Sequence, residues 1–207
     1  LVLILPSDHI IAPVEKLITA INHGKDAADR GDIVVFGVEP TTPATGYGYI
    51  KVENSATIAP VLSFREKPDL ETATRYLASG RHLWNTGIFL FRASTMIHAL
   101  KSHCPDILDC TRATLDGSAA DNGLIQLDPD LFQLIPAESI DFAVMEKASN
   151  ITVVRAAFDW HDVGSFASLM ALADKDAAGN AVRGDVISHE SSGNLLHSEG
   201  PLIATVG

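Results

Sequence analysis

The chain has 207 residues, of which 46% are hydrophobic and 20% are charged, which is enough apolar material for a globular protein with one main domain and an appendage. The formal net charge of −11 disfavours binding to nucleic acid or to an anionic membrane surface. A phosphorylated ligand would therefore be small and held by a few local cations and a metal.

The first residues predict a strand, a helix and a second strand. The apolar run Leu1–Leu5 predicts a buried strand whose carboxyl end delivers Asp8 to a loop. Apolar side chains then recur at helical spacing from Pro13 to about residue 30, although Gly24 weakens the pattern. Residues 33–38 form a second apolar run. This order predicts a right-handed crossover and a parallel sheet.

The middle of the chain predicts a mixed sheet beside the parallel one. Residues 49–53 and 58–65 are typical of strands in a β-ribbon or meander. A short helix over residues 70–77 ends at Gly80, and residues 84–91 predict a core strand.

Helices dominate the next segment. Two helical stretches over residues 94–115 are separated by Pro105. A helix over residues 139–147, which Ser139 can cap, is expected before a strand. The remaining expected elements are that strand, at residues 151–154, and a helix at residues 165–173.

We predict an α/β core over residues 1–175 and a β-rich segment over residues 176–207. Beyond Gly179, short apolar segments are spaced by Gly and Ser, as in turns of a β-solenoid or a small β appendage. The chain begins within a strand pattern and without methionine. We therefore expect a piece of a longer protein.

Cysteine use and hydropathy predict a cytoplasmic protein. Cys104 and Cys110 match neither a zinc site nor a disulfide framework, which favours reduced thiols. No apolar run has the length of a membrane span, and no targeting segment is recognisable in the sequence.

Two distant aspartates form the first candidate site. Taken singly, Asp8 is explained equally well as a helix cap, and Asp162 as a residue of an ordinary turn. If folding brings them together, they form a pair of oxygen ligands for one hard cation. The pair therefore suggests a metal-assisted phosphoryl reaction.

Polar residues at loop and strand ends form a second group of candidates, each with a simpler structural alternative. The glycines around Gly46 can let a ligand approach the backbone, or they can belong to a plain loop. Asn85 and Thr86 suit sugar hydroxyls, or they form a turn. Glu66 and Lys67 place an acid beside a base, as a surface ion pair also does.

Seven motifs in order resemble those of bacterial mannose-1-phosphate guanylyltransferases. They are Leu-Pro-Ser-Asp-His at 5–9, Phe-Gly-Val-Glu-Pro-Thr at 36–41, Thr-Gly-Tyr-Gly-Tyr-Ile at 45–50, Glu-Lys-Pro at 66–68, Trp-Asn-Thr-Gly-Ile-Phe at 84–89, Ser-Ile-Asp-Phe-Ala-Val-Met-Glu-Lys at 139–147 and Trp-His-Asp-Val-Gly-Ser at 160–165. In addition, Gly-Asp-Val at 184–186 is similar to the start of that family's β-helical segment.

The resemblance implies a nucleotide-diphospho-sugar transferase fold, which is α/β and Rossmann-like with a mixed sheet. The core would lack its first strand–helix units and would be followed by the start of a β-helix. The implied reaction transfers GMP from GTP to α-D-mannose 1-phosphate and gives GDP-mannose and pyrophosphate, with Mg²⁺ or another divalent cation. A homo-oligomer and a C-terminal isomerase domain in the parent protein are both compatible with this family.

The resemblance also implies roles for single residues. Asp8 and Asp162 match the family's metal-binding aspartates, and Lys67 matches the lysine that holds phosphate. The remaining matched positions line the sugar pocket: Gly46, Glu66, Asn85, Thr86 and, less closely matched, Asp141.

The sequence departs from the family at several points. Ala44, Phe142 and His161 stand where the family commonly has glutamate, tyrosine and asparagine. The family's glycine-rich loop, which cradles the triphosphate and reads the base, is not in this sequence. Two alternatives stay open: a nucleotidyltransferase for another sugar 1-phosphate, and a non-catalytic regulatory subunit that binds a sugar nucleotide.

Overall fold

The computed structural model describes the backbone of residues 1–207 and all of their side chains except that of Asp121. The chain divides into two compact units. The first contains residues 1–6 and 12–158, and the second contains residues 7–11 and 159–207. The predicted domain boundary near residue 175 stays a prediction.

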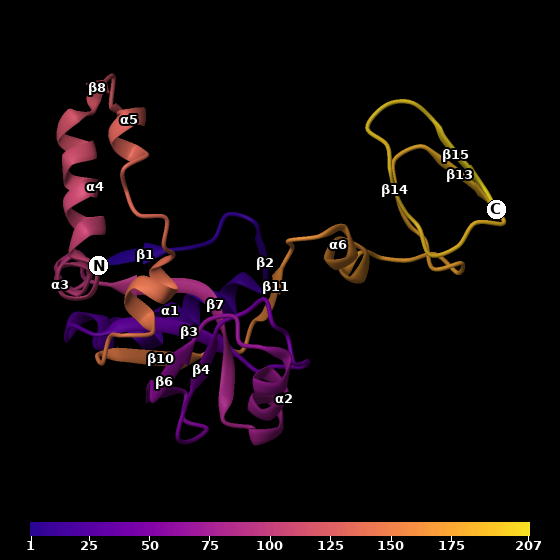
Figure 1. Cartoon of the computed structure of the whole chain (residues 1–207). Helices are drawn as coiled ribbons and strands as arrows, with labels where there is room; N and C mark the ends of the chain where they lie inside the picture. The colour runs from indigo at the N-terminus through magenta and orange to yellow at the C-terminus, as the bar shows by residue number, and fades with distance from the viewer. The chain divides into compact units, whose positions relative to one another are not determined.

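A seven-stranded mixed sheet forms the centre of the first unit (Figure 1). The strand order is β5-β10-β3-β7-β4-β6, and β1 pairs with β7 outside this path. Strands β3 and β10 are parallel, whereas β7 runs antiparallel to β1, β3 and β4. The predicted mixed sheet is therefore confirmed. The strands are β1 (Val2–Ile4), β3 (Ile33–Val38), β4 (Tyr49–Lys51), β5 (Ile58–Pro60), β6 (Ser63–Arg65), β7 (His82–Phe91) and β10 (Ile151–Arg155).

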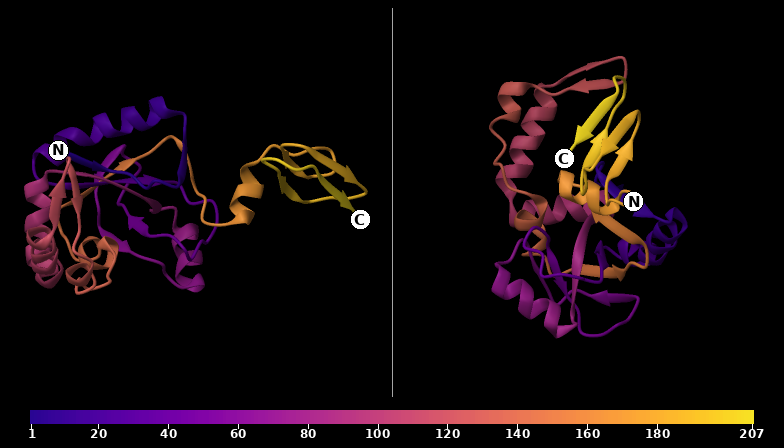
Figure 2. Two further views of the ribbon diagram at one scale, coloured as in Figure 1. Left: turned by 90° about the horizontal axis from the view of Figure 1, so that it is seen from above. Right: turned by 90° about the vertical axis from the view of Figure 1, so that its right-hand side faces the viewer.

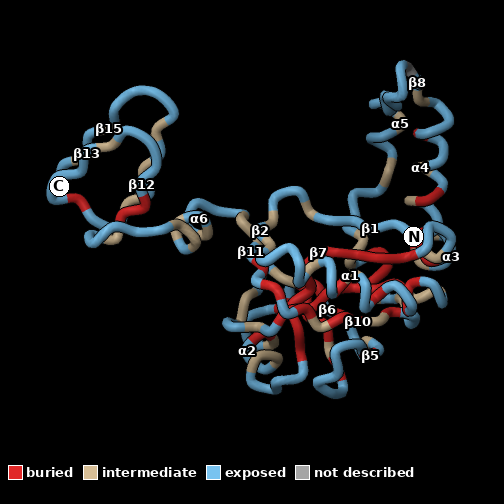
Figure 3. Tube along the Cα trace, turned by 180° about the vertical axis from the view of Figure 1, so that it is seen from behind, coloured by how far each residue is buried: buried red, intermediate tan, exposed pale blue. Residues whose placement is uncertain are grey.

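Strand β1 is exposed, so the prediction that Leu1–Leu5 is buried is wrong. These five residues have exposed fractions between 37% and 55%, and β1 contrasts with the buried β7 in Figure 3. Strand β1 pairs with β7, and β7 also pairs with β3. The strands β1 and β3 are thus parallel to each other, as predicted, but β7 lies between them and runs antiparallel to both, so this part of the sheet is mixed.

Strands β5 and β6 lie at opposite edges of the sheet, although only Val61 and Leu62 separate them in sequence. The Val61 N–H donates to the Ile151 carbonyl oxygen, and the Leu62 N–H donates to the Lys51 carbonyl oxygen, both at 2.9 Å. This short segment therefore links the two sheet edges. The predicted ribbon is confirmed for β4 and β6, whereas β5 pairs with β10.

Helix α1 (Val14–Asp29) packs across one face of the sheet and continues through Gly24. A Cβ atom at Gly24 would lie 2.9 Å from Val34 Cγ1 and 3.4 Å from Val154 Cγ2. The glycine therefore permits a close approach of helix to sheet, and this contact compensates for its poor helix propensity. Figure 2 shows α1 running along the sheet in indigo.

The opposite face of the sheet is covered by α3 (Ala93–His103) and by a π-helical turn, η1 (Asp141–Met145). Met96 and Val144 belong to one buried apolar cluster with the sheet residues Val35 and Phe89. Because both faces are covered, every residue of β3 is buried.

Helices α2 and α4 of the first unit confirm the sequence pattern. Helix α2 (Leu70–Ser79) begins at an Asp69 cap, and Gly80 ends it in a left-handed conformation. Helix α4 (Pro105–Gly117) begins at Pro105, as predicted. A hairpin of β8 (Ala119–Asp121) and β9 (Leu124–Gln126) follows, and then α5 (Pro129–Phe132).

The second unit contains short paired strands and one helix. Strand β2 (His9–Ala12) pairs with β11 (Asp159–Asp162), and Ser165 caps α6 (Phe166–Leu172). Two parallel pairs follow, in which β12 (Ala181–Arg183) pairs with β14 (Leu195–His197), and β13 (Val186–His189) pairs with β15 (Ile203–Val206).

A buried asparagine ties these parallel strands together. The Asn180 side chain donates to the Ser191 carbonyl oxygen at 3.0 Å and accepts from the Asn194 backbone and side-chain amides, both at 3.0 Å.

Among the helices of the described chain, none combines the length and the apolar character needed to cross a membrane.

Protonation of His82 should destabilise the first unit. The ring is 7% exposed and stacks on Tyr76 at 3.9 Å. Burial, with the nearby positive charges of Lys51 and Arg81, lowers the pKa of His82 from 6.5 to about 4. The unfolded chain therefore binds more protons than the folded chain between these two values, so the free energy of unfolding falls as the pH drops through that window.

We expect this single group to remove about 3 kcal/mol of stability between pH 7 and pH 4. Urea unfolding of the wild-type chain and of His82→Asn across that range measures the effect. The difference between the two unfolding free energies should change with pH, because only the wild type titrates at this position. A difference that stays constant with pH would contradict the prediction.

Candidate active site

Polar side chains of the first unit gather where β7 begins, beside the carboxyl end of β3. Asn85 pairs with Gly37, and Trp84 pairs with Val38. The register between β3 and β7 shifts between Val35 and Gly37, which marks a bulge. Bulges re-aim the side chains next to them and are frequent beside active sites.

Thr86 lies at this bulge and is fully buried. Its hydroxyl donates to the Phe36 carbonyl oxygen at 2.9 Å, which satisfies a backbone acceptor where the regular ladder is interrupted. The Thr86 hydroxyl is thus engaged within the sheet.

Asn85 is held on two sides and keeps one polar atom unpaired. Its backbone N–H donates to the Gly48 carbonyl oxygen at 2.8 Å, and its Nδ2 donates to Asp141 Oδ1 at 3.3 Å. Asn85 Oδ1 and the adjacent Trp84 Nε1 are buried without a hydrogen-bond partner among the described residues. Because unpaired buried polar groups are costly, a ligand that pairs with Asn85 Oδ1 would relieve this cost.

Glu66 and Lys67 follow directly after β6. Glu66 is only 9% exposed, which argues against an ordinary surface ion pair, and its Oε1 lies 3.7 Å from Lys67 Nζ. The Lys67 side chain is 60% exposed, and its backbone N–H donates to the Tyr47 carbonyl oxygen at 3.2 Å. The segment therefore presents a buried carboxylate beside an accessible ammonium group.

Two carboxylates of this cluster have raised pKa values. Burial raises the pKa of Glu66, and the negative charge of Asp141 raises it further. Burial likewise raises the pKa of Asp141. Both groups therefore bind hydrogen-bond donors favourably, and sugar hydroxyls are donors of this kind.

The glycine loop before β4 contributes through Gly48 more than through Gly46. A Cβ atom at Gly48 would lie 2.6 Å from Glu66 Oε2 and 3.3 Å from Asn85 Cβ. A Cβ atom at Gly46 would meet no atom within 4 Å. Gly48 thus makes room for two candidate side chains, whereas the space at Gly46 is open.

The segment that carries Asp141 is a single π-helical turn, so the prediction of a helix over residues 139–147 is wrong in type. The Glu146 N–H donates to the Asp141 carbonyl oxygen at 2.9 Å. The residue at the cap position of the turn is Ile140, so Ser139 does not cap it. Turns of this type are rare and often lie at functional sites.

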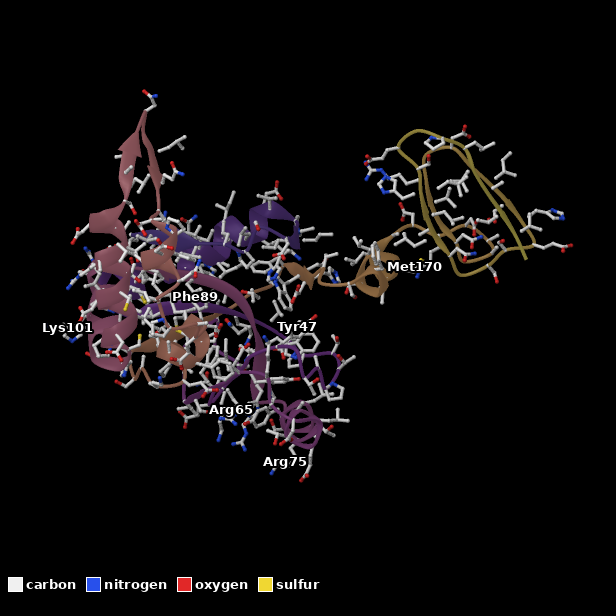
Figure 4. All side chains as sticks on the ribbon, turned by 45° about the horizontal axis from the view of Figure 1, so that its top comes forward. Tyr47, Arg65, Arg75, Phe89, Lys101 and Met170 are labelled. Atoms are coloured by element: carbon white, nitrogen blue, oxygen red, sulfur yellow. The ribbon has the colours of Figure 1, made fainter. Side chains whose placement is uncertain are left out.

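Sequence reasoning gave Trp84 and Glu146 no role in this cluster, and it named Gly48 only as one of two glycines in a loop. Gly48 and Trp84 lie in the Gly-Tyr-Gly and Trp-Asn sequences, but their neighbours in space come from segments distant in sequence. Tyr47 and Arg65, which flank Gly48 and Glu66 in sequence, lie in one region of the first unit in Figure 4, whereas Lys101 on α3 lies away from it.

The two candidate metal ligands both belong to the second unit, and they lie near one imidazole. His9 Nε2 is 4.0 Å from Asp8 Oδ1 and 3.7 Å from Asp162 Oδ1. The Trp160 indole N–H donates to His9 Nδ1 at 3.0 Å, and the two rings meet edge to face. Trp160 thereby places the remaining ring proton of the neutral imidazole on Nε2, which faces the two carboxylates.

Neither aspartate serves as a helix cap. Pro13 occupies the cap position of α1, and Ser165 caps α6. The Asp8 side chain is 74% exposed, and the Asp162 side chain is 35% exposed.

Among the described side chains, no group of three or more His, Cys, Asp or Glu residues is arranged to hold a metal. Two carboxylates nonetheless fit Mg²⁺, which commonly binds to one or two carboxylates together with substrate phosphates and water.

Comparison with known proteins shows which proteins this chain is similar to. A family profile described as "Nucleotidyl transferase" matches residues 1–179. A mannose-1-phosphate guanylyltransferase from Salmonella montevideo is 43% identical over 215 residues, which cover 100% of this chain and 45% of that protein. The alginate biosynthesis protein AlgA from Pseudomonas fluorescens is 43% identical over 211 residues, which cover 100% of this chain and 44% of that protein.

Two solved structures are similar to this chain in fold and in sequence. A crystal structure described as a mannose-1-phosphate geranyltransferase from Thermus thermophilus has a TM-score of 0.81 and 31% identity, and covers 99% of this chain and 59% of that chain. A structure described as a mannose-6-phosphate isomerase from Helicobacter pylori has a TM-score of 0.73 and 31% identity, and covers 77% of this chain and 64% of that chain. The chain spans less than half the length of the curated relatives above.

Proposed function

Because the chain belongs to the nucleotidyl transferase family, we propose that it forms part of a mannose-1-phosphate guanylyltransferase. The reaction transfers GMP from GTP to α-D-mannose 1-phosphate and gives GDP-mannose and pyrophosphate, for use in polysaccharide synthesis. Relatives that carry this enzyme name are 39% to 43% identical over the whole chain, and others are alginate or xanthan biosynthesis proteins.

The observation that best supports a sugar ligand is the set of buried acceptors in the first unit. Asn85 Oδ1 has no partner among the described residues, and the carboxylates of Glu66 and Asp141 have raised pKa values. Three acceptors with few donors suit a ligand with several hydroxyl groups, such as a hexose. Gly46 has open space beside it, where such a ligand can approach the backbone.

Charge neutralisation in the reaction would come from two sources. Lys67 offers an exposed ammonium group to the phosphate of the sugar phosphate. Asp8 and Asp162 would hold Mg²⁺ or another divalent cation, which lowers the cost of negative charge on phosphoryl oxygens. The sugar phosphate attacks the α-phosphorus of GTP directly, so no covalent enzyme intermediate is required.

We also propose that the fold is completed by segments outside this chain. The chain covers 45% of the Salmonella relative, and the exposed β1 offers an apolar face to a preceding strand–helix unit. The parallel pairs β12–β14 and β13–β15, with their buried Asn180, are what the first coils of a β-helix would contain. A homo-oligomer remains a further expectation.

A product assay of the complete protein tests the proposed function. GTP and other nucleoside triphosphates are each combined with mannose 1-phosphate and with other sugar 1-phosphates in the presence of Mg²⁺. We expect GDP-mannose to form fastest. Faster turnover with another pair would establish a different nucleotidyltransferase, and binding of GDP-mannose without turnover by any pair would indicate a non-catalytic subunit.

Lys67→Ala should mainly weaken the use of the sugar phosphate. Losing one ammonium group that binds phosphate should raise KM for mannose 1-phosphate by about tenfold or more, with less change in KM for GTP. Steady-state kinetics with each substrate varied in turn measures this split. Lys101→Ala on α3, outside the candidate site, is the matched control, and unchanged kinetics for Lys67→Ala would remove Lys67 from the site.

A further inference from the structure

We propose that Glu146 is a positioning residue, which holds the Glu66–Lys67 segment in the conformation that presents both side chains to the ligand. The identity of that ligand rests on the proposed function above, whereas the clamp itself rests on contacts within the first unit.

Glu146 binds the segment through both of its carboxylate oxygens. Oε1 accepts a hydrogen bond from the Glu66 backbone N–H at 2.9 Å, across 80 positions of sequence. Oε2 lies 3.7 Å from Arg65 Nη1, and the Glu146 side chain is 20% exposed. Because each oxygen already faces a protein partner, Glu146 is suited to support the site and not to bind the ligand.

The segment that Glu146 holds has an unfavourable backbone conformation. Lys67 has a φ of 42°, in the left-handed region that side chains other than glycine seldom adopt. Pro68 follows and disfavours the right-handed helical conformation for Lys67. Strained residues persist where surrounding contacts fix them, and such residues are often found at functional sites.

Two successive backbone amides of this segment are fixed from outside it. Glu146 accepts the N–H of Glu66, and the Tyr47 carbonyl oxygen accepts the N–H of Lys67 at 3.2 Å. Together these bonds fix the peptide from which both candidate side chains project. Without the first bond, we expect the segment to move toward less strained conformations.

The π-helical turn explains how one segment supports two parts of the site. Asp141 begins this turn and accepts from Asn85 Nδ2, and Glu146 follows its end and accepts from the Glu66 N–H. The turn therefore fixes Asp141 against one candidate residue and Glu146 against another.

The charge of Glu146 carries an electrostatic cost. Its negative charge contributes to the raised pKa values of both Glu66 and Asp141, after the larger effect of burial. A third carboxylate close to two others is unfavourable unless hydrogen bonds or ion pairs of its own oxygens offset the repulsion. The hydrogen bond from the Glu66 N–H and the ion pair with Arg65 offset this repulsion.

Two substitutions separate the clamp from a simple charge effect. Glu146→Ala removes the acceptor, whereas Glu146→Gln removes the charge but keeps an amide oxygen that can accept from the Glu66 N–H. Glu138→Ala is the control, because Glu138 is an exposed acid that pairs with Lys147 outside the cluster. Hydrogen exchange of the peptide that contains residues 64–67 reports the clamp directly and requires no catalytic activity.

In Glu146→Ala we expect faster exchange in this peptide, and a KM for mannose 1-phosphate raised about tenfold with KM for GTP unchanged, as for the loss of one hydrogen bond to a charged group. Glu146→Gln should stay within about threefold of the wild type in both readouts. Unchanged exchange in Glu146→Ala, or Glu146→Gln as defective as Glu146→Ala, would overturn the clamp. If the wild-type protein does not turn over mannose 1-phosphate, the proposed function fails, while the exchange result still decides the clamp.

Discussion

Asp8→Asn and Asp162→Asn should each lower turnover by several orders of magnitude while leaving the free energy of unfolding nearly unchanged. Asparagine keeps the shape of aspartate but carries no charge, so it binds a hard divalent cation much more weakly. The Asp8 side chain is 74% exposed, and neither residue caps a helix. Their loss should therefore affect the metal and the reaction far more than the fold.

The measurement combines kinetics with metal binding. GDP-mannose formation gives the turnover, and titration of the protein with Mn²⁺ monitored by electron paramagnetic resonance gives cation binding without catalysis. Asp159→Asn is the matched control, because Asp159 is an exposed aspartate on the same strand, β11. We expect weaker Mn²⁺ binding only in the first two variants. If both keep wild-type Mn²⁺ affinity and turnover, the aspartates are turn residues.

Burial was the property of the fold that the sequence predicted least well. The apolar runs at β3 and β10 predict buried strands, and this prediction is correct. It succeeds because helices or turns cover both faces of the sheet there. An equally apolar run at Leu1–Leu5 is exposed, because burial depends on what packs against a strand and not on the strand alone. Gly24 illustrates the same limit, since its value lies in contacts with Val34 and Val154.

The candidate site was predicted in part from motifs, but its supporting contacts were not. In the sequence, Asp8 and Asp162 each have an adequate local explanation, and the resemblance favoured the interpretation of the pair as metal ligands over it. Glu146 could not be found by spacing, because its partner is the backbone amide of Glu66, 80 positions away. The π-helical turn was predicted as an ordinary helix, because nine residues do not distinguish the two periodicities.

Gly48→Ala should strongly lower kcat/KM, because it displaces side chains of the candidate sugar site. The new methyl group would lie 2.6 Å from Glu66 Oε2, 3.2 Å from Phe64 Cζ and 3.3 Å from Asn85 Cβ. The Glu66 carboxylate can move away, since it is the end of a flexible side chain, but it then leaves the position beside Asn85. Because misplacement of a binding group by about 1 Å can cost two orders of magnitude, we expect kcat/KM to fall about 100-fold.

The loss of stability in Gly48→Ala should be small, at about 1 kcal/mol, because the closest contact is relieved by a side-chain rotation. Urea unfolding and steady-state kinetics on the same samples separate the two effects. Gly200→Ala is the control, since its methyl group meets no atom within 4 Å. Gly46→Ala should keep the free energy of unfolding of the wild type, because its methyl group also meets no protein atom within 4 Å. A rise in KM for mannose 1-phosphate in this variant would therefore report that the ligand approaches the backbone at Gly46. Wild-type kinetics in Gly48→Ala would show that Glu66 and Asn85 do not have to keep their positions, and both residues would then leave the proposed sugar site.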